Sequence, residues 1–249
     1  VAPVDGDSYS FKVTAQDVPL DGTTIGLLSK PLAEQLLSFC PQGNVNLTLD
    51  FKTPDGNDPA PYSAQVDCLG LKISHTRFPY PLENVRGTIS LAGDGLTLRN
   101  VTALPADPCQ TRPSASLCVD GSLSLPKGGF AGAVCTVKAR DLILTKALGE
   151  AMPRSLRGFY RGLSPQGPFD LDVTNLTVSR IGSDEMLVEY AAKADFRGCD
   201  LRVSGLEAEL TGFVETEGSY NTKRGLSNGR ARLAGERLKV KGRTVSNVT

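Results

Sequence analysis

The feature that most constrains this chain is an internal repeat. Val13-Thr-Ala-Gln-Asp17-Val-Pro-Leu20 aligns with Val137-Lys-Ala-Arg-Asp141-Leu-Ile-Leu144, and Pro41-Gln-Gly43 aligns with Pro165-Gln-Gly167 at the same offset. Self-similarity at a fixed period is the sequence signature of a repeated supersecondary unit. The repeat therefore predicts two tandem copies of one unit, the first spanning residues 1–132 and the second spanning residues 133–249.

The alignment continues further along the chain, but its offset grows. The additional aligned pairs are Tyr62–Asp67 with Tyr190–Asp195, Ala92–Leu98 with Ala234–Val240, and Asn100–Thr102 with Asn247–Thr249. The growth places an insertion in the second copy around Glu217–Gly229, whose glycine, serine and asparagine content predicts a loop. The segment from Cys109 to Cys118 has no counterpart in the second copy.

Alternating apolar and polar residues predict that both copies consist mainly of β-strands. The apolar members of the clearest runs are Val45, Leu47, Leu49 and Phe51 in the first copy and Phe169, Leu171 and Val173 in the second. Polar residues stand between them, and this two-residue period places one class of side chain on each face of a sheet. Short connections rich in glycine, proline, asparagine and aspartate predict about seven strands per copy in a mainly antiparallel sheet.

One helix is expected in each copy. The expected helices span about residues 29–40 and 147–163. Apolar residues recur there at three- and four-residue steps: Leu28, which directly precedes the first helix, Leu32, Leu36 and Phe39, and then Met152, Leu156, Tyr160 and Leu163. Pro41 and Pro165 are expected to end these helices. Gly43 and Gly167 then supply the positive φ that a turn into the next strand needs.

Composition and charge exclude several classes of function. Lysine and arginine total 27 and balance 27 aspartates and glutamates, so no long-range field favours nucleic acid. No apolar run approaches the roughly 20 residues that cross a bilayer, and no signal segment opens the chain. Because the chain begins at Val1 rather than at a methionine, we expect a fragment of a longer protein, with any membrane anchor outside it.

No group of catalytic or metal-binding residues stands out in either copy. His75 is the only histidine, so neither a catalytic triad nor a multi-histidine metal centre can form within these residues. Asp17 and Asp141 occupy equivalent positions, but they lack the spacing of a calcium loop and are interpreted as turn carboxylates. We therefore expect a protein that is not an enzyme and that holds no metal and no cofactor.

The six cysteines lack the Cys-x-x-Cys spacing of a zinc site. Cys109 and Cys118 flank a loop rich in proline and serine, which a disulfide could close in an oxidising compartment. Free thiols buried along strands explain the cysteines equally well.

Two runs of the sequence resemble a known family. Phe78–Ile89 followed by Leu96–Ala103 is similar to the repeating strands of AsmA-like proteins, which include the TamB-type repeating β-groove proteins. Ser164–Leu171 is similar to the strand start of that family, a Pro-x-Gly followed by alternating apolar residues. The resemblance implies an extended, curled antiparallel sheet that forms an open groove, with one helix per repeat.

The resemblance also implies a function. Family members are anchored in the inner membrane of diderm bacteria, and their apolar groove carries phospholipid or another acyl-chain lipid across the periplasm in outer-membrane biogenesis. No catalytic residues are implied. A sheet face without specific polar ligands holds hydrocarbon through burial of apolar surface alone, which lets a lipid slide.

Candidate groove-lining residues are apolar members of the alternating strands. They are Val45, Leu47, Leu49, Leu96, Leu98, Phe169, Leu171, Val173, Leu238 and Val240. Each of them could equally fill a closed core beneath a helix. The alternative function is accordingly a structural or adhesive β-repeat module with closed cores, which binds through its outer surface.

Overall fold

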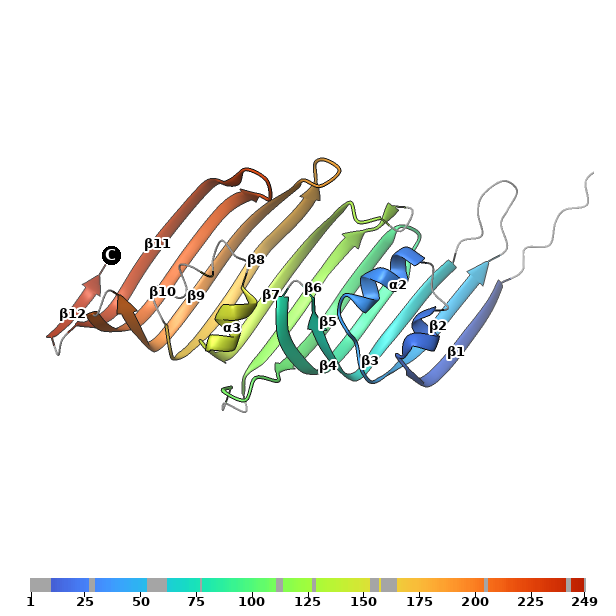
Figure 1. Cartoon of the computed structure of the whole chain (residues 1–249), viewed down its shortest axis with the longest axis horizontal. Helices are drawn as coiled ribbons and strands as arrows, with labels where there is room; N and C mark the ends of the chain where they lie inside the picture. Colours follow the sequence, from blue (N-terminus) through green and yellow to red (C-terminus); the bar gives the residue numbers. More distant parts are fainter. Residues whose placement is uncertain are drawn as a thin grey trace, which may run out of the picture.

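A computed structural model describes residues 10–26, 30–52, 62–76, 78–110, 114–126, 129–152, 157, 165–203, 206–240 and 243–248. These residues form one sheet of twelve strands, and every strand pairs with its neighbours in sequence (Figure 1). The strands are β1 (Ser10–Pro19), β2 (Asn44–Lys52), β3 (Tyr62–His75), β4 (Phe78–Ala92), β5 (Gly95–Pro105), β6 (Ser116–Ser124), β7 (Gly132–Ile143), β8 (Pro168–Arg180), β9 (Met186–Val203), β10 (Leu206–Asn221), β11 (Gly225–Val240) and β12 (Arg243–Val248). The helices are α1 (Gly22–Gly26), α2 (Lys30–Leu37) and α3 (Lys146–Ala151).

All strand pairs are antiparallel, and the sheet is not closed, because β1 pairs only with β2 and β12 only with β11. The prediction of a mainly β, mainly antiparallel chain is confirmed. The expectation of about seven strands per copy is wrong. Six strands, β1–β6, lie in the N-terminal half of the chain, and six, β7–β12, lie in the C-terminal half.

The register places apolar and polar residues on opposite faces of the sheet. Residues directly opposite one another on neighbouring strands share a face. Leu47 pairs with Val66, and Val66 with Ile89, whereas Thr48 pairs with Gln65. The alternation along each strand therefore becomes apolar rows and polar rows that run across the whole sheet.

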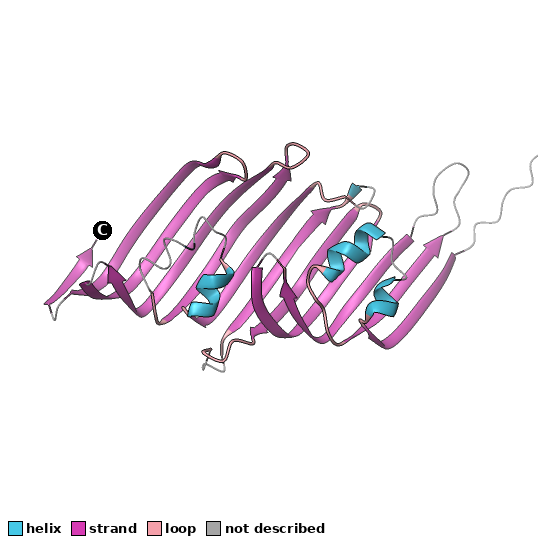
Figure 2. Cartoon of the chain, in the orientation of Figure 1, coloured by secondary structure: helices cyan, strands magenta, loops and turns pink. Residues whose placement is uncertain are grey.

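The helices lie on the apolar face, and Figure 2 shows α1, α2 and α3 in front of the same side of the sheet. α1 and α3 lie near the lower ends of the strands in this view, whereas α2 lies in front of their middle. Leu148 and Ala151 of α3 pack in a buried core with Ala139 of β7 and Phe169 of β8. That core also contains Tyr80, which comes from β4. The N-terminal and C-terminal halves therefore share a core and are not separate globules.

Bulges interrupt several strand pairs at the residues where the backbone turns left-handed. Asp17 in β1 and Asp141 in β7 both have φ 55°, and both lie at register shifts. The Asp17 N–H donates to Asn46 Oδ1 at 3.0 Å, and the Asp141 N–H donates to Asp170 Oδ1 at 2.7 Å. These bonds satisfy amides that the bulges release from the ladder, and the extra residues bend the strands.

The predicted helices are shorter than expected. α2 falls within residues 29–40, but α1 precedes it, so the N-terminal half has two helices rather than one. α3 ends at Ala151 instead of continuing to residue 163, because Met152 is already extended, with φ −60° and ψ 151°. Pro153 follows Met152, and a residue before proline disfavours the helical region. Leu156, Tyr160 and Leu163 lie outside the described residues.

The predicted loop at Glu217–Gly229 is instead a continuation of two strands. Glu217 pairs with Arg230, and Ser219 with Asn228, so this segment lengthens β10 and β11. The turn is confined to three residues, where the Asn221 side-chain oxygen accepts the N–H groups of Lys223 and Arg224 at 2.9 and 3.0 Å. One asparagine turn is enough to reverse the chain, and the remaining glycine and serine residues are compatible with paired strands.

The later part of the sequence alignment also differs from the strand order. Ala92–Leu98 contains the turn between β4 and β5, whereas Ala234–Val240 lies entirely within β11. These two segments therefore do not occupy equivalent places in the sheet. Cys109 and Cys118 are free thiols in the structure and are not bonded to each other. Cys118 is partly buried in β6, but Cys109 is exposed in a turn, so buried strand thiols do not explain Cys109.

Candidate functional site: the apolar strip

Two adjacent rows of mainly apolar residues cross the helix-bearing face of the sheet from β1 to β10. The first row, in strand order, is Val13, Leu49, Ala64, Leu91, Leu96, Leu123, Ala133, Val178, Val188 and Tyr220. The second row is Ala15, Leu47, Val66, Ile89, Leu98, Gly121, Cys135, Leu176, Tyr190 and Gly218. We call these two rows the apolar strip, and it contains no charged residue.

The apolar strip is exposed or partly buried along its length. Val13 is 45% exposed, and every other member of the strip is only partly buried. Nearer the helices, on the same face, Val45 is 3% exposed and Ala139 is fully buried. Within the strip, Val66 and Ile89 pack against the buried core that contains Val45 and Leu71.

The opposite face of the sheet is charged in its C-terminal half. A cross-strand row of alternating sign runs through Lys138, Asp172, Lys193, Glu215 and Arg232, on β7 to β11. Opposite charges directly across a strand pair stabilise its register, and they keep this face hydrated. The two faces of the sheet therefore differ in polarity in this half of the chain.

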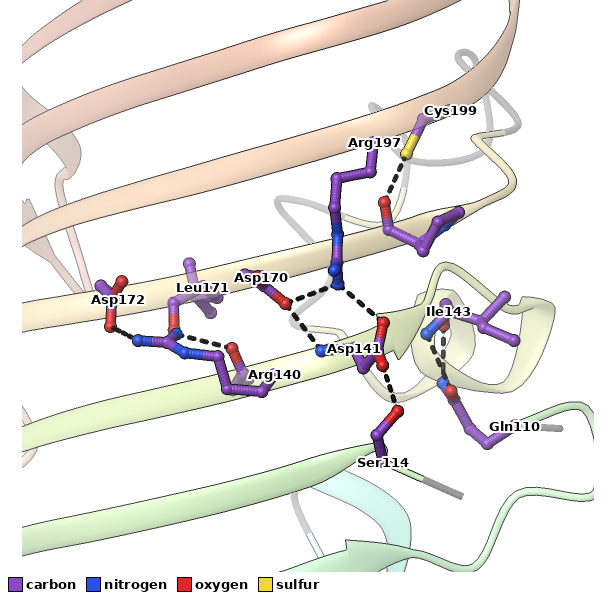
Figure 3. A network of polar contacts seen from close by, with 12 residues as sticks. Gln110, Ser114, Arg140, Asp141, Ile143, Asp170, Leu171, Asp172, Arg197 and Cys199 are labelled. Atoms are coloured by element: carbon purple, nitrogen blue, oxygen red, sulfur yellow. Dashed lines mark hydrogen bonds and ion pairs between the residues drawn. The ribbon is translucent and has the colours of Figure 1, made fainter. Parts of the chain in front are cut away.

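A network of polar contacts lies on this charged face, near the bulge in β7 (Figure 3). Arg197 Nη2 lies 2.7 Å from Asp141 Oδ1 and 2.9 Å from Asp170 Oδ1, and the Ser114 hydroxyl donates to Asp141 Oδ2. Beside it, Arg140 Nη2 lies 2.6 Å from Asp172 Oδ1, a hydrogen bond that raises the pKa of Arg140. These carboxylates tie neighbouring strands together, in keeping with a structural role for Asp141.

The predicted groove-lining residues fall into four groups. Leu47, Leu49, Leu96 and Leu98 belong to the apolar strip. Val45 and Phe169 are buried in the cores beneath the helices, and Leu171 packs against the edge of the α3 core. Val173 is partly buried, one row closer to the helices than the strip. Leu238 and Val240 belong to β11, but their side chains lie outside the described residues.

Several members of the strip were not singled out from the sequence, among them Ile89, Val178 and Tyr190. A usable signal exists for Tyr190, because Val188, Tyr190, Ala192 and Ala194 alternate with Glu189, Lys193 and other residues of the opposite face. Small residues weaken such a pattern. Only the cross-strand register shows that Tyr190 belongs to the same row as Leu47.

The described residues hold no cluster of histidine, cysteine, aspartate or glutamate that could bind a metal ion. None of their helices is both long and apolar enough to traverse a bilayer. His75 lies at the end of β3, where its ring meets Phe39 edge-on with centroids 4.8 Å apart. In the strip, burial raises the pKa of the Cys135 thiol.

Comparison with known proteins gives no match, whether by family model, by curated sequence or by solved structure. The AsmA-like family suggested by the sequence therefore stays a prediction.

Proposed function

We propose that this chain is a non-enzymatic lipid-binding segment that holds acyl chains along the apolar strip. The observation that carries the proposal is an apolar row that continues through ten consecutive strands without an intervening charge and whose described members stay partly exposed. Monomeric soluble proteins rarely leave large contiguous apolar patches exposed, and such patches mark ligand or partner surfaces.

The dimensions of the strip suit hydrocarbon chains. Nine strand spacings of about 4.8 Å separate β1 from β10, which makes the strip about 43 Å long. Burial of apolar surface stabilises a bound chain by roughly 25 cal/mol per Å², whatever its position along the strip. Because no charged side chain fixes the ligand, a lipid held in this way can move across successive strands.

We also propose that the two halves are tandem copies of one unit, with residues 1–132 and 133–249 as the two repeats. Equivalent loop geometry supports this proposal: Gly43 and Gly167 have φ 120° and 126°. The Leu20 N–H donates to Gly43 O, and the Leu144 N–H donates to Gly167 O, both at 2.9 Å. A repeated sheet that bends at each bulge provides the curled, open groove expected of AsmA-like proteins.

The wider setting follows from the family resemblance. We propose a periplasmic location, an inner-membrane anchor outside this segment, and conduction of phospholipid between the two membranes of a diderm envelope. The structural or adhesive alternative requires closed cores with the recognition surface outside. The partial exposure of Leu47, Leu98 and Tyr190 favours the lipid proposal over that alternative.

The proposal is tested by native mass spectrometry. The chain is incubated with vesicles of phosphatidylethanolamine and phosphatidylglycerol, separated from them without detergent, and analysed for bound phospholipid. We expect at least one phospholipid to remain bound per chain. Protein that emerges lipid-free at every vesicle concentration would remove the basis of the proposal.

A further inference from the structure

The connection between β5 and β6 reaches from the N-terminal half of the chain into the C-terminal half. Gln110, in this connection, bonds to both backbone groups of Ile143 at the end of β7 (Figure 3). Its Nε2 donates to Ile143 O at 2.6 Å, and its Oε1 accepts the Ile143 N–H at 2.8 Å. The pairing of β6 with β7 stops at Arg140, so the amide of Gln110 takes the place that a strand would occupy beside Ile143.

A second contact joins the same connection to the start of α3. The Thr145 hydroxyl donates to Asp107 Oδ2 at 2.5 Å, and Thr145 Oγ1 accepts the Leu148 N–H at 3.2 Å as the N-cap of the helix. Asp107 is 5% exposed. A buried carboxylate with a hydrogen-bonded partner is costly to separate from that partner, so this contact holds the helix start firmly.

Helix α3 covers part of the apolar face. Leu148 and Ala151 pack over Ala139, Phe169 and Cys199, which are all nearly or completely buried. Ala139 lies on the same strand and the same face as Cys135, a member of the apolar strip. Removal of α3 would therefore widen the strip across β7–β9.

The arrangement at α1 is different. There the N-cap contact is local, because Asp21 Oδ1 accepts the Thr24 N–H at 2.8 Å. Within the described chain, the connection from β5 to β6 contacts the start of α3 and not the start of α1. The cover of the C-terminal half is thus held by residues of the N-terminal half.

We propose that Asp107 and Gln110 form a strap that keeps α3 closed over the apolar face. Release of the strap opens β7–β9 locally, while the sheet stays folded. The consequence for ligand uptake rests on the lipid-binding function proposed above. The opening itself does not, and it can be measured without lipid.

Two buried thiols provide a matched pair of reporters. Cys199 is fully buried in the core that also contains Leu148 and Ala151 of α3, whereas Cys68 is 5% exposed in the separate core that contains Val45 and Leu71. Desolvation is the largest cause that raises the pKa of each thiol to about 11. Asp67 adds to this effect at Cys68, whereas a backbone hydrogen bond from Arg197 partly opposes it at Cys199. The labelling rate of each thiol reports the population of states in which its own core opens.

The experiment compares alkylation rates of Cys199 and Cys68 in the Gln110→Ala and Asp107→Ala variants with those in the unmodified chain, by peptide mass spectrometry. Loss of a hydrogen bond of ordinary strength should raise Cys199 labelling about fivefold and leave Cys68 unchanged. Equal acceleration of both thiols would mean general destabilisation, and unchanged Cys199 labelling would mean that the strap does not hold α3. Either result overturns the proposal.

Asn221→Ala is the control, because Asn221 is a buried, hydrogen-bonded side chain at the turn between β10 and β11. It should not accelerate Cys199 selectively. If the strap variants fail to fold, hydrogen exchange on the unmodified chain decides: the Leu148 amide should exchange faster than amides in the centre of β7. Equal exchange of the two would refute a local opening.

A measurement of lipid uptake by the same variants distinguishes the strap from the proposed lipid-binding function. Gln110→Ala should take up phospholipid from vesicles faster than the unmodified chain, in parallel with Cys199 labelling. If no variant binds lipid but Cys199 still responds selectively, the lipid function falls and the strap stands. If lipid binds and the labelling of Cys199 does not respond, the strap proposal falls and the lipid function stands.

Discussion

Cys118 and Cys135 lie on opposite faces of the hairpin formed by β6 and β7. Cys118 pairs with Lys138 in a polar row, and Cys135 pairs with Gly121 in the apolar strip. Both side chains are partly buried. The two thiols therefore lie close together on neighbouring strands but on different faces of the sheet. Their labelling can show on which face a ligand binds.

Bound lipid should protect Cys135 from alkylation and leave Cys118 reactive. A hydrocarbon on the strip excludes reagent and water from Cys135, so its labelling should slow about tenfold at nine-tenths occupancy. Burial raises the pKa of both thiols, and the Asp120 carboxylate adds to the effect at Cys118, so labelling at mildly alkaline pH gives usable thiolate. Equal protection of both thiols would argue against the strip as the binding surface.

A charge placed in the strip should abolish lipid binding. Leu98 pairs with Ile89 and Gly121 near the middle of the strip, so Leu98→Lys should weaken phospholipid binding at least about tenfold by opposing an apolar ligand with an unpaired charge. The lysine stem can cover much of the same surface, so stability should change little. Binding is measured by vesicle titration with a fluorescent phospholipid.

The matched control is Thr97→Lys, one residue away on the opposite face, where Thr97 pairs with Ser90 and Ser122. It introduces the same charge and should leave lipid binding within about twofold of the unmodified chain. A similar loss of binding in both variants would indicate a nonspecific effect of charge.

Much of this fold can be predicted from local patterns. Leu47 and Thr48 fall on opposite faces because a strand alternates its side chains, and short turns make neighbouring strands antiparallel. Such features depend only on residues adjacent in the sequence. They identify the apolar face without any knowledge of what lies above it.

The position of the apolar strip within that face is not predictable in the same way. Val45 and Leu47 belong to one alternating run, yet Val45 is buried in a core and Leu47 lies in the strip. The difference depends on where the helices end and on contacts across more than 30 residues, such as the one between Gln110 and Ile143. The alternation of residues along one strand predicts neither the helix ends nor these long-range contacts.

The close approach of β4 and β5 should make Gly87 irreplaceable. Gly87 has φ 131°, and a Cβ at this position would lie 2.5 Å from Asn100 O. Gly87→Ala therefore combines a backbone conformation that alanine disfavours with a clash against backbone, and should cost more than about 2 kcal/mol. The free energy of unfolding is measured by urea titration.

The control for this change is Gly22→Ala at the start of α1, where a Cβ would have no neighbour within 4 Å. Alanine has the better helix propensity, so stability should stay the same or rise by about 0.5 kcal/mol. A Gly87→Ala variant as stable as Gly22→Ala would contradict the close strand approach.

The buried thiols of Cys68 and Cys199 should make the fold alkali-sensitive. Desolvation, the largest cause, raises the pKa of each thiol from 9.0 to about 11 in the folded chain. Between these values the unfolded chain releases thiol protons that the folded chain retains, so stability is fully present below pH 9 and falls as the pH rises toward 11. Urea midpoints at pH 8 and pH 10 should differ more in the unmodified chain than in the Cys68→Ala/Cys199→Ala double variant.

The control is Cys40→Ala, which removes a thiol from an exposed position. Identical pH dependence in the double variant and the unmodified chain would show that neither thiol is desolvated as the fold requires.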